Sequence, residues 1–237
     1  MPRSARVAPG GMIFHVLNRA NARGELFDDS GDYAAFEKCL GEALAIVPVD
    51  LLCYCFMPNH WHLVLRPRCD GDLGRFMQRL TVTHVRRWHE HRHSAGRGHL
   101  YQGTYKSFPV QADGRDESHF LTLCRYVERN ALRANLVRRA ENWRWSSLRL
   151  RTAPPAPAAG VALPPLSEWP VPVPPDWLSR VNRPQRAAEV HAVQQSMKRG
   201  QPLGEPAWQR RVAGKLGLEH TFRPRGRPKK EAMDASK

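Results

Sequence analysis

The 237-residue chain lacks the apolar segments that would place a protein across a membrane. No apolar run approaches the roughly 20 residues that a membrane-spanning helix needs. No apolar stretch follows the charged residues at the start of the chain, as it would in a signal peptide. We therefore expect a cytoplasmic protein with no membrane partner.

Cysteine is scarce, and its spacing excludes two common kinds of small domain. The chain has five cysteines, an odd number, and no Cys-x-x-Cys pair. A disulfide framework and a Cys-rich zinc site are therefore not expected. Cys39, Cys53 and Cys124 have apolar neighbours, which predicts that they are small core residues of a reduced protein.

Acidic residues are too few to balance the basic ones. The chain has 22 Asp and Glu against 37 Lys and Arg, a net charge of +15, and an isoelectric point near 10.4. Such a surplus attracts polyanions with an affinity that falls with salt and does not depend on sequence. Nucleic acid is the expected partner in preference to an anionic membrane surface, which competes for the same kind of charge.

Hydrophobic periodicity predicts an ordered series of strands and helices over the first 130 residues. In chain order these are strand 12–18, helix 32–47, strands 49–57 and 60–66, helix 72–91, strand 105–111 and helix 117–130. This order predicts an α+β fold of the ferredoxin-like split β-α-β type, with an antiparallel sheet, helices on one face and the other face free for a site. RNA-recognition modules share this topology, so the fold alone does not choose a function.

The composition changes sharply after about residue 150. We expect a domain over 1–150, an extended Pro- and Ala-rich linker over 151–176, a small helical appendage over 177–220 and a basic tail over 221–237. The appendage contains two helical patterns, about 185–199 and 205–216.

The segment His60-Trp61-His62 is the most informative motif of the chain. It opens a predicted strand, and because side chains alternate along a strand, His60 and His62 point to the same face. Two imidazoles side by side make half of a metal site. The alternative is one exposed and one packed histidine at the edge of a sheet.

A second pair of residues lies on the predicted helix 117–130. Tyr126 and Asn130 are four residues apart and therefore share a face. On their own they are typical of a packed tyrosine and a helix-ending asparagine. Together with the two histidines they indicate a divalent cation held by two imidazoles and an amide oxygen, with open positions for a scissile phosphate. The Tyr126 oxygen would then attack phosphorus and form a phosphotyrosine ester, which keeps the energy of the bond for rejoining.

These motifs stand in a longer series that points to a family. The series comprises Met57-Pro-Asn-His-Trp-His-Leu-Val-Leu65, Leu123-Cys-Arg-Tyr-Val-Glu-Arg-Asn130 and the segments 10–19, 98–106, 133–137 and 143–147. In these residues the chain resembles the single-tyrosine HUH transposase superfamily, and within it the REP-associated tyrosine transposases. The resemblance implies that His60 and His62 bind the metal, that Tyr126 is the nucleophile and that Asn130 is the third ligand.

The resemblance also implies a substrate, a cofactor and further contacts. The substrate would be hairpin-forming single-stranded DNA, the cofactor Mg²⁺ or Mn²⁺, and Tyr105 and Lys106 would contact DNA. The chain departs from many relatives in having Ala131 in place of proline, which would let the helix continue, and Asn135 in place of glycine.

The tail carries an independent DNA-binding signal. The run Arg223-Pro-Arg-Gly-Arg-Pro-Lys-Lys230 resembles an AT-hook. A narrow A·T-rich minor groove is strongly negative and suits inserted arginine. The predicted contacts with flanking duplex DNA are Arg225, Gly226, Arg227, Pro228, Lys229 and Lys230. A generic basic tail would bind phosphates without preferring A·T.

The sequence thus predicts a metal-dependent tyrosine transposase that cleaves and rejoins single-stranded DNA, associated with the nucleoid and either a monomer or a homodimer. The first alternative is a catalytically inactive DNA-binding, repressor-like protein. The second is a structural protein stabilised by zinc.

Overall fold

A four-stranded antiparallel sheet forms the centre of the protein in the computed structural model, which describes residues 7–96, 98–112, 119–152 and 164–223. The strands are β1 (Ile13–Arg19), β2 (Val49–Met57), β3 (His60–Pro67) and β4 (Lys106–Val110), in the order β2-β3-β1-β4. Each neighbouring pair is antiparallel. The α+β class and the split β-α-β topology predicted from the sequence are confirmed.

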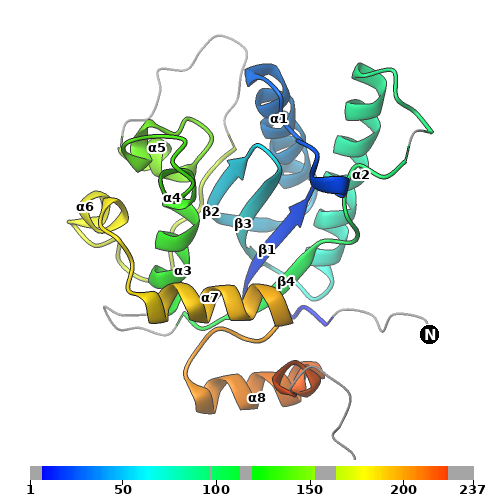
Figure 1. Ribbon diagram of the computed structural model, residues 1–237. Coiled ribbons are helices and arrows are strands. Elements are labelled where there is room, and N and C mark those ends of the chain that lie inside the picture. Colours follow the sequence, from blue (N-terminus) through cyan, green and yellow to red (C-terminus); the bar gives the residue numbers. More distant parts are fainter. Residues whose placement is uncertain (1–6, 97, 113–118, 153–163, 224–237) are drawn as a thin grey trace, which may run out of the picture.

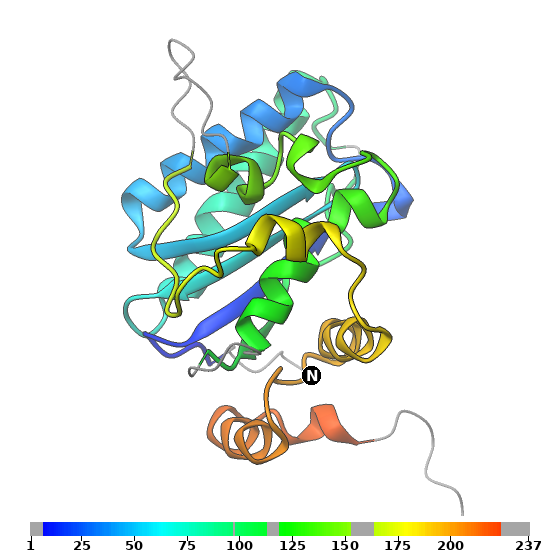
Figure 2. The same cartoon turned by 90° about the vertical axis from the view of Figure 1, so that its left-hand side faces the viewer.

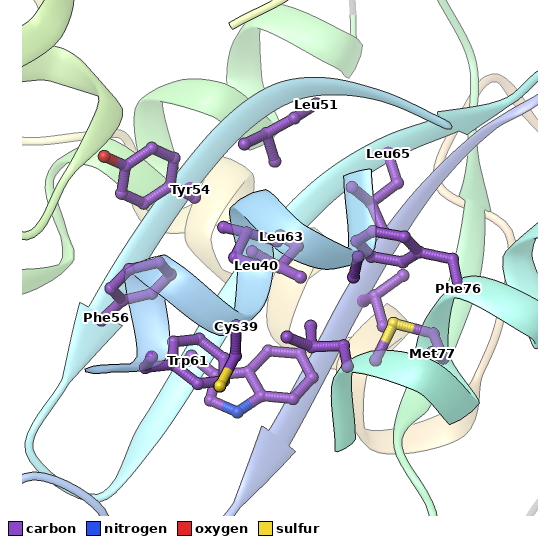
Figure 3. Packing of buried hydrophobic residues seen from close by; sticks show 14 of the residues in the cluster. Cys39, Leu40, Leu51, Tyr54, Phe56, Trp61, Leu63, Leu65, Phe76 and Met77 are labelled. Atoms are coloured by element: carbon purple, nitrogen blue, oxygen red, sulfur yellow. The ribbon is translucent and has the colours of Figure 1, made fainter. Parts of the chain in front are cut away.

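Helices α1 (Ser30–Ile46) and α2 (Asp72–His91) cover one face of the sheet (Figure 1). The Asp29 carboxylate begins α1 by accepting hydrogen bonds from the Gly31 and Asp32 amides, and Pro48 follows its last turn. Strand residues such as Phe56 and Leu65 form one buried cluster with Leu40 of α1 and Phe76 of α2 (Figure 3). The larger core cluster therefore lies on this side.

The opposite face, expected to be free, is covered by α3 (His119–Glu128). The reason is that this face is also apolar: Leu52, Val64 and Phe108 point to it and are buried. The apolar side of α3, which includes Phe120 and Leu123, buries them. The two helices of the split β-α-β unit share one face as predicted, and the additional helix takes the other.

Glu128 links α3 to two later helices, α5 (Ser147–Thr152) and α6 (Trp177–Asn182). Its carboxylate accepts hydrogen bonds from Ser147 Oγ at 2.6 Å and from Trp177 Nε1 at 2.7 Å. Arg151 Nε lies 3.4 Å from the same carboxylate. Burial raises the pKa of Glu128, and these donors act against that shift. A single buried acid thus joins three segments of the chain.

The described part of the Pro- and Ala-rich segment packs onto the domain. Trp169 is buried, donates through Nε1 to the Leu52 carbonyl at 2.7 Å, and meets Phe120 edge-on. The Ser167 amide donates to the Leu51 carbonyl at 2.8 Å, beside the outer edge of β2. Residues 164–176 are therefore attached to the sheet, and the domain boundaries taken from composition stay a prediction.

The appendage contains the two predicted helices, α7 (Ala187–Arg199) and α8 (Pro206–Leu216). Between them, Leu203 forms a parallel bridge with Val110 at the outer edge of β4, and its carbonyl accepts from the Gln111 amide at 2.9 Å. Gly204 lies so close to Trp208 and Gln111 that a Cβ would come within 2.5 Å of the indole. This attachment holds α7 across the end of the sheet (Figures 1 and 2).

The remaining elements are short. They are η1 (Asn21–Arg23), α4 (Asn130–Arg133), η2 (Ala140–Asn142) and η3 (Glu219–Phe222). In the ranges that the structure describes, no helix has both the length and the apolar character to span a bilayer.

Candidate active site

The two histidines of β3 lie side by side on the face of the sheet that α3 covers. Their ring centroids are 5.0 Å apart and the rings meet edge-on. The register places His60 opposite Arg19 and His62 opposite Leu17 on β1. The period-two prediction that both rings share one face therefore agrees with the geometry.

Each of these rings is held through its Nδ1 atom. His60 Nδ1 lies 2.6 Å from Asn59 Oδ1, and His62 Nδ1 lies 2.8 Å from His15 Nε2. Nε2 is thus the atom that each ring can offer to a cation. His62 can offer it only in the tautomer in which its Nδ1–H donates to His15.

Burial keeps both rings neutral. It lowers the pKa of His60 to about 4, and the nearby Arg19 and Arg133 charges add to this effect. Burial also lowers the pKa of His62 well below its ordinary value, with His60 as the next cause. Neutral imidazole is the form that binds metal.

Tyr126 of α3 reaches the same site from the opposite side. Its ring centroid is 6.3 Å from that of His62, and its side chain is 5% exposed. Asn130, the first residue of α4, lies one helical turn further on and lines the same pocket, which has a volume of about 340 Å³. The four residues that the sequence singled out for chemistry are therefore brought together.

Arg133 contacts both Tyr126 and Asn130. Its guanidinium carbon lies 3.8 Å from the centre of the Tyr126 ring, and its Nη2 donates to Asn130 Oδ1 at 2.6 Å. Burial raises the pKa of Tyr126, while the Arg133 charge and a hydrogen bond with Gln194 oppose the increase. Desolvation therefore outweighs the positive charge beside the phenol.

The predicted DNA contacts divide into three groups. Lys106 lines the pocket, next to the histidines. Tyr105 is partly buried against the cluster of α1 and α2 instead. The six predicted tail contacts, Arg225, Gly226, Arg227, Pro228, Lys229 and Lys230, lie outside the described residues.

Several residues of the site were not predicted. His15 lies in segment 10–19, and Arg133 begins segment 133–137. Both segments are among those in which the chain resembles the transposase superfamily. The helix α7 supplies Gln194, Met197 and Lys198 to the pocket wall. No local pattern signals this contribution, because it depends on how a distant segment docks.

The donor set fits a divalent cation at the two imidazoles. Both Nε2 atoms belong to neutral rings fixed by a second hydrogen bond, as metal-binding histidines usually are. Asn130 is engaged differently: its oxygen accepts from Arg133, and its Nδ2 is buried without a partner among the described residues. To bind a cation through its oxygen, Asn130 would have to lose the hydrogen bond from Arg133. Across the described ranges, no group of three His, Cys, Asp or Glu residues is placed to hold a metal ion.

Comparisons with known proteins give the chain a family and a fold. The family model for IS200-like transposases matches residues 10–130. A solved structure of a REP-associated tyrosine transposase bound to a REP hairpin shares the fold, with a TM-score of 0.51 and 16% identity over 68% of this chain and 88% of that chain. A candidate transposase from Deinococcus radiodurans R1 has 17% identity and a TM-score of 0.36, over 47% of this chain and 85% of that one. No curated protein matches the chain. Because the family model spans more than half of its residues, the protein belongs to the family of IS200-like transposases.

Proposed function

We propose that this transposase cleaves and rejoins hairpin-forming single-stranded DNA through a phosphotyrosine intermediate on Tyr126. The observation that carries the proposal is the shared pocket of Tyr126, His60 and His62, which also contains cationic side chains and no acidic one among its described lining residues. A phenol, two neutral imidazoles and a positive rim together suit attack on a phosphodiester.

In the proposed reaction, the Tyr126 Oη–phosphorus bond forms as the bond from phosphorus to the oxygen of the neighbouring nucleotide breaks. The phenolic proton passes to solvent, and the departing oxygen takes up a proton to become a free hydroxyl. A new ester replaces the old one, so the reverse attack by a hydroxyl rejoins the strand without ATP. Arg133 holds the Tyr126 ring from one side and brings positive charge to the site.

A divalent cation, Mg²⁺ or Mn²⁺, is proposed at His60 and His62, with Asn130 as a further candidate ligand. When bound, it would make the phosphorus more electrophilic and neutralise charge in the transition state. Both proposed ligands on β3 are held by Asn59 and His15, which fixes their ring orientation.

The substrate is proposed from the structural neighbour that is bound to a REP hairpin. The net charge of +15 supports a nucleic-acid partner of this kind. The basic tail, with its Arg-Gly-Arg-Pro core, is proposed to hold flanking duplex DNA in the A·T-rich minor groove.

The test is a labelled single-stranded hairpin, incubated with the full chain and Mn²⁺ and then run on a denaturing gel. We expect a covalent protein–DNA adduct with the wild type and none with Tyr126→Phe, while both bind the hairpin equally. Tyr33→Phe, in α1 on the opposite side of the sheet, is the matched control and is expected to form the adduct. An adduct that survives in Tyr126→Phe would refute the assignment of the nucleophile.

Two observations favour a second candidate function, a DNA-binding protein without catalysis. The Asn130 oxygen already accepts from Arg133, and burial raises the pKa of Tyr126. If the wild type binds hairpins and forms no adduct with any divalent cation, this second function is the correct one.

A further inference from the structure

Helix α7 contributes to the pocket although it lies far outside the residues that the family model matches. That model ends at residue 130, whereas α7 begins at Ala187. Gln194, Met197 and Lys198 of this helix nevertheless line the pocket together with Tyr126. The appendage is therefore a wall of the site in the same chain.

The helix is fixed at both ends, so this wall has a defined position. At its start, Glu189 lies 3.7 Å from Arg125 of α3. In its middle, Val193 is fully buried. At its end, Gly200 adopts the left-handed conformation and turns the chain toward Leu203, which bridges to β4.

The residues that α7 presents have the chemistry of a phosphate site. The Gln194 side chain forms a hydrogen bond with the Tyr126 hydroxyl. The Lys198 side chain shares the pocket with two further cations, Lys106 of β4 and Arg19 of β1. Lysine binds phosphate as a point charge, and positive charge close to the reacting phosphorus stabilises a transition state that carries negative charge.

We propose that α7 completes the active site: Lys198 binds the phosphate that Tyr126 attacks, and Gln194 positions the Tyr126 hydroxyl. This inference rests on the proposed function and deepens it. The active site would then be built from residues 10–130, which the family model matches, and from α7 of the appendage. It also distinguishes the two residues, because Lys198 contacts the substrate and Gln194 acts through the nucleophile.

The role of Lys198 is tested by binding, which needs no chemistry. Fluorescence anisotropy measures the affinity of Lys198→Met for a labelled single-stranded hairpin over a range of salt concentrations. Loss of one phosphate contact is expected to lower the salt slope by about 0.7. Lys215→Met, an exposed lysine of α8, is the control and is expected to match the wild type. Equal slopes and affinities for Lys198→Met and the wild type would overturn the proposal for Lys198.

The role of Gln194 is tested by the rate of adduct formation at saturating DNA. Gln194→Leu and Gln194→Met are expected to be about tenfold slower with unchanged affinity, because misplacing a reacting group slows the chemical step. Methionine keeps the length of the side chain and adds no charge but cannot donate to the hydroxyl, so a role in packing alone would leave Gln194→Met as fast as the wild type. Gln195→Leu, at a neighbouring position that does not line the pocket, is the control.

The two experiments also separate this inference from the proposed function. If the wild type forms no adduct, transesterification by Tyr126 fails, and the binding experiment still decides whether α7 contacts DNA at the pocket. If the wild type forms an adduct and the α7 variants match it in rate, affinity and salt slope, the proposed function stands and this inference is wrong.

Discussion

His15 is the buried partner of His62, and replacing it with phenylalanine isolates that contact. His15→Phe keeps a ring of similar size between His62 and Phe108, whose centroids lie 5.0 and 4.8 Å from that of His15. It removes the 2.8 Å hydrogen bond to His62 Nδ1. The change therefore tests how His15 sets the orientation and tautomer of the His62 ring, while the packed volume at position 15 stays similar.

The expected cost is in metal affinity rather than in folding. Loss of the group that orients a metal-binding histidine weakens binding about 10- to 100-fold, which corresponds to about 1.4 to 2.7 kcal/mol. The free energy of unfolding is expected to change by less than about 1 kcal/mol. The reason is that His15 Nδ1 already lacks a partner among the described residues, so one unpaired buried nitrogen replaces another.

Isothermal titration of the full chain with MnCl₂ measures the affinity, and urea denaturation measures stability. His15→Gln is expected to recover part of the affinity, because its side-chain oxygen can accept from His62 Nδ1–H. His84 is buried in α2, which covers the opposite face of the sheet, and His84→Phe is expected to leave Mn²⁺ affinity unchanged. Equal Mn²⁺ affinity in the wild type and His15→Phe, or no binding by the wild type, would refute the reasoning.

Three further predictions concern stability and DNA binding. Glu128→Ala is expected to lower the free energy of unfolding by roughly 3 kcal/mol or more, because it leaves Ser147 Oγ and Trp177 Nε1 without their buried acceptor; Glu128→Gln should lose less in the same urea titration. Burial lowers the pKa of His84 to about 3, so below pH 6.5 the unfolded chain binds more protons than the folded one. The free energy of unfolding should therefore fall by about 1.4 kcal/mol per pH unit between pH 6.5 and pH 3 on account of His84. A weaker dependence of stability on pH in His84→Gln checks this. Deleting residues 223–237 is expected to weaken duplex binding most for A·T-rich DNA and to leave adduct formation intact; an equal loss on G·C-rich DNA would reduce the tail to a non-specific arm.

The parts of the site that the sequence predicted correctly depend on local periodicity. The period of two on a strand gave the common face of His60 and His62, and the spacing of four on a helix gave the pairing of Tyr126 with Asn130. The helix does not continue without a break in the absence of proline at position 131: α3 ends at Glu128, and a separate short helix, α4, begins at Asn130. These relations involve neighbours in the chain, which a sequence specifies directly.

The parts that could not be predicted depend on contacts between distant segments. Trp169 stands alone in a Pro- and Ala-rich stretch, where no periodicity marks it as buried. The approach of Lys198 to the pocket depends on the pairing of Leu203 with Val110 of β4, which are far apart in the sequence. Composition predicted a boundary near residue 150, but composition carries no information about docking.

The segments beside β2 and β4 have a consequence for how copies of the protein meet. An outer strand with open amides and carbonyls is a template on which another chain can add a strand. Here Ser146 and Ser167 occupy part of that template on β2, and Leu203 occupies part of it on β4. A second molecule would have to displace these segments before it could extend the sheet. Docking of the appendage thus protects the protein from strand-swapped aggregation, and mutations that loosen residues 200–205 would expose it to insolubility.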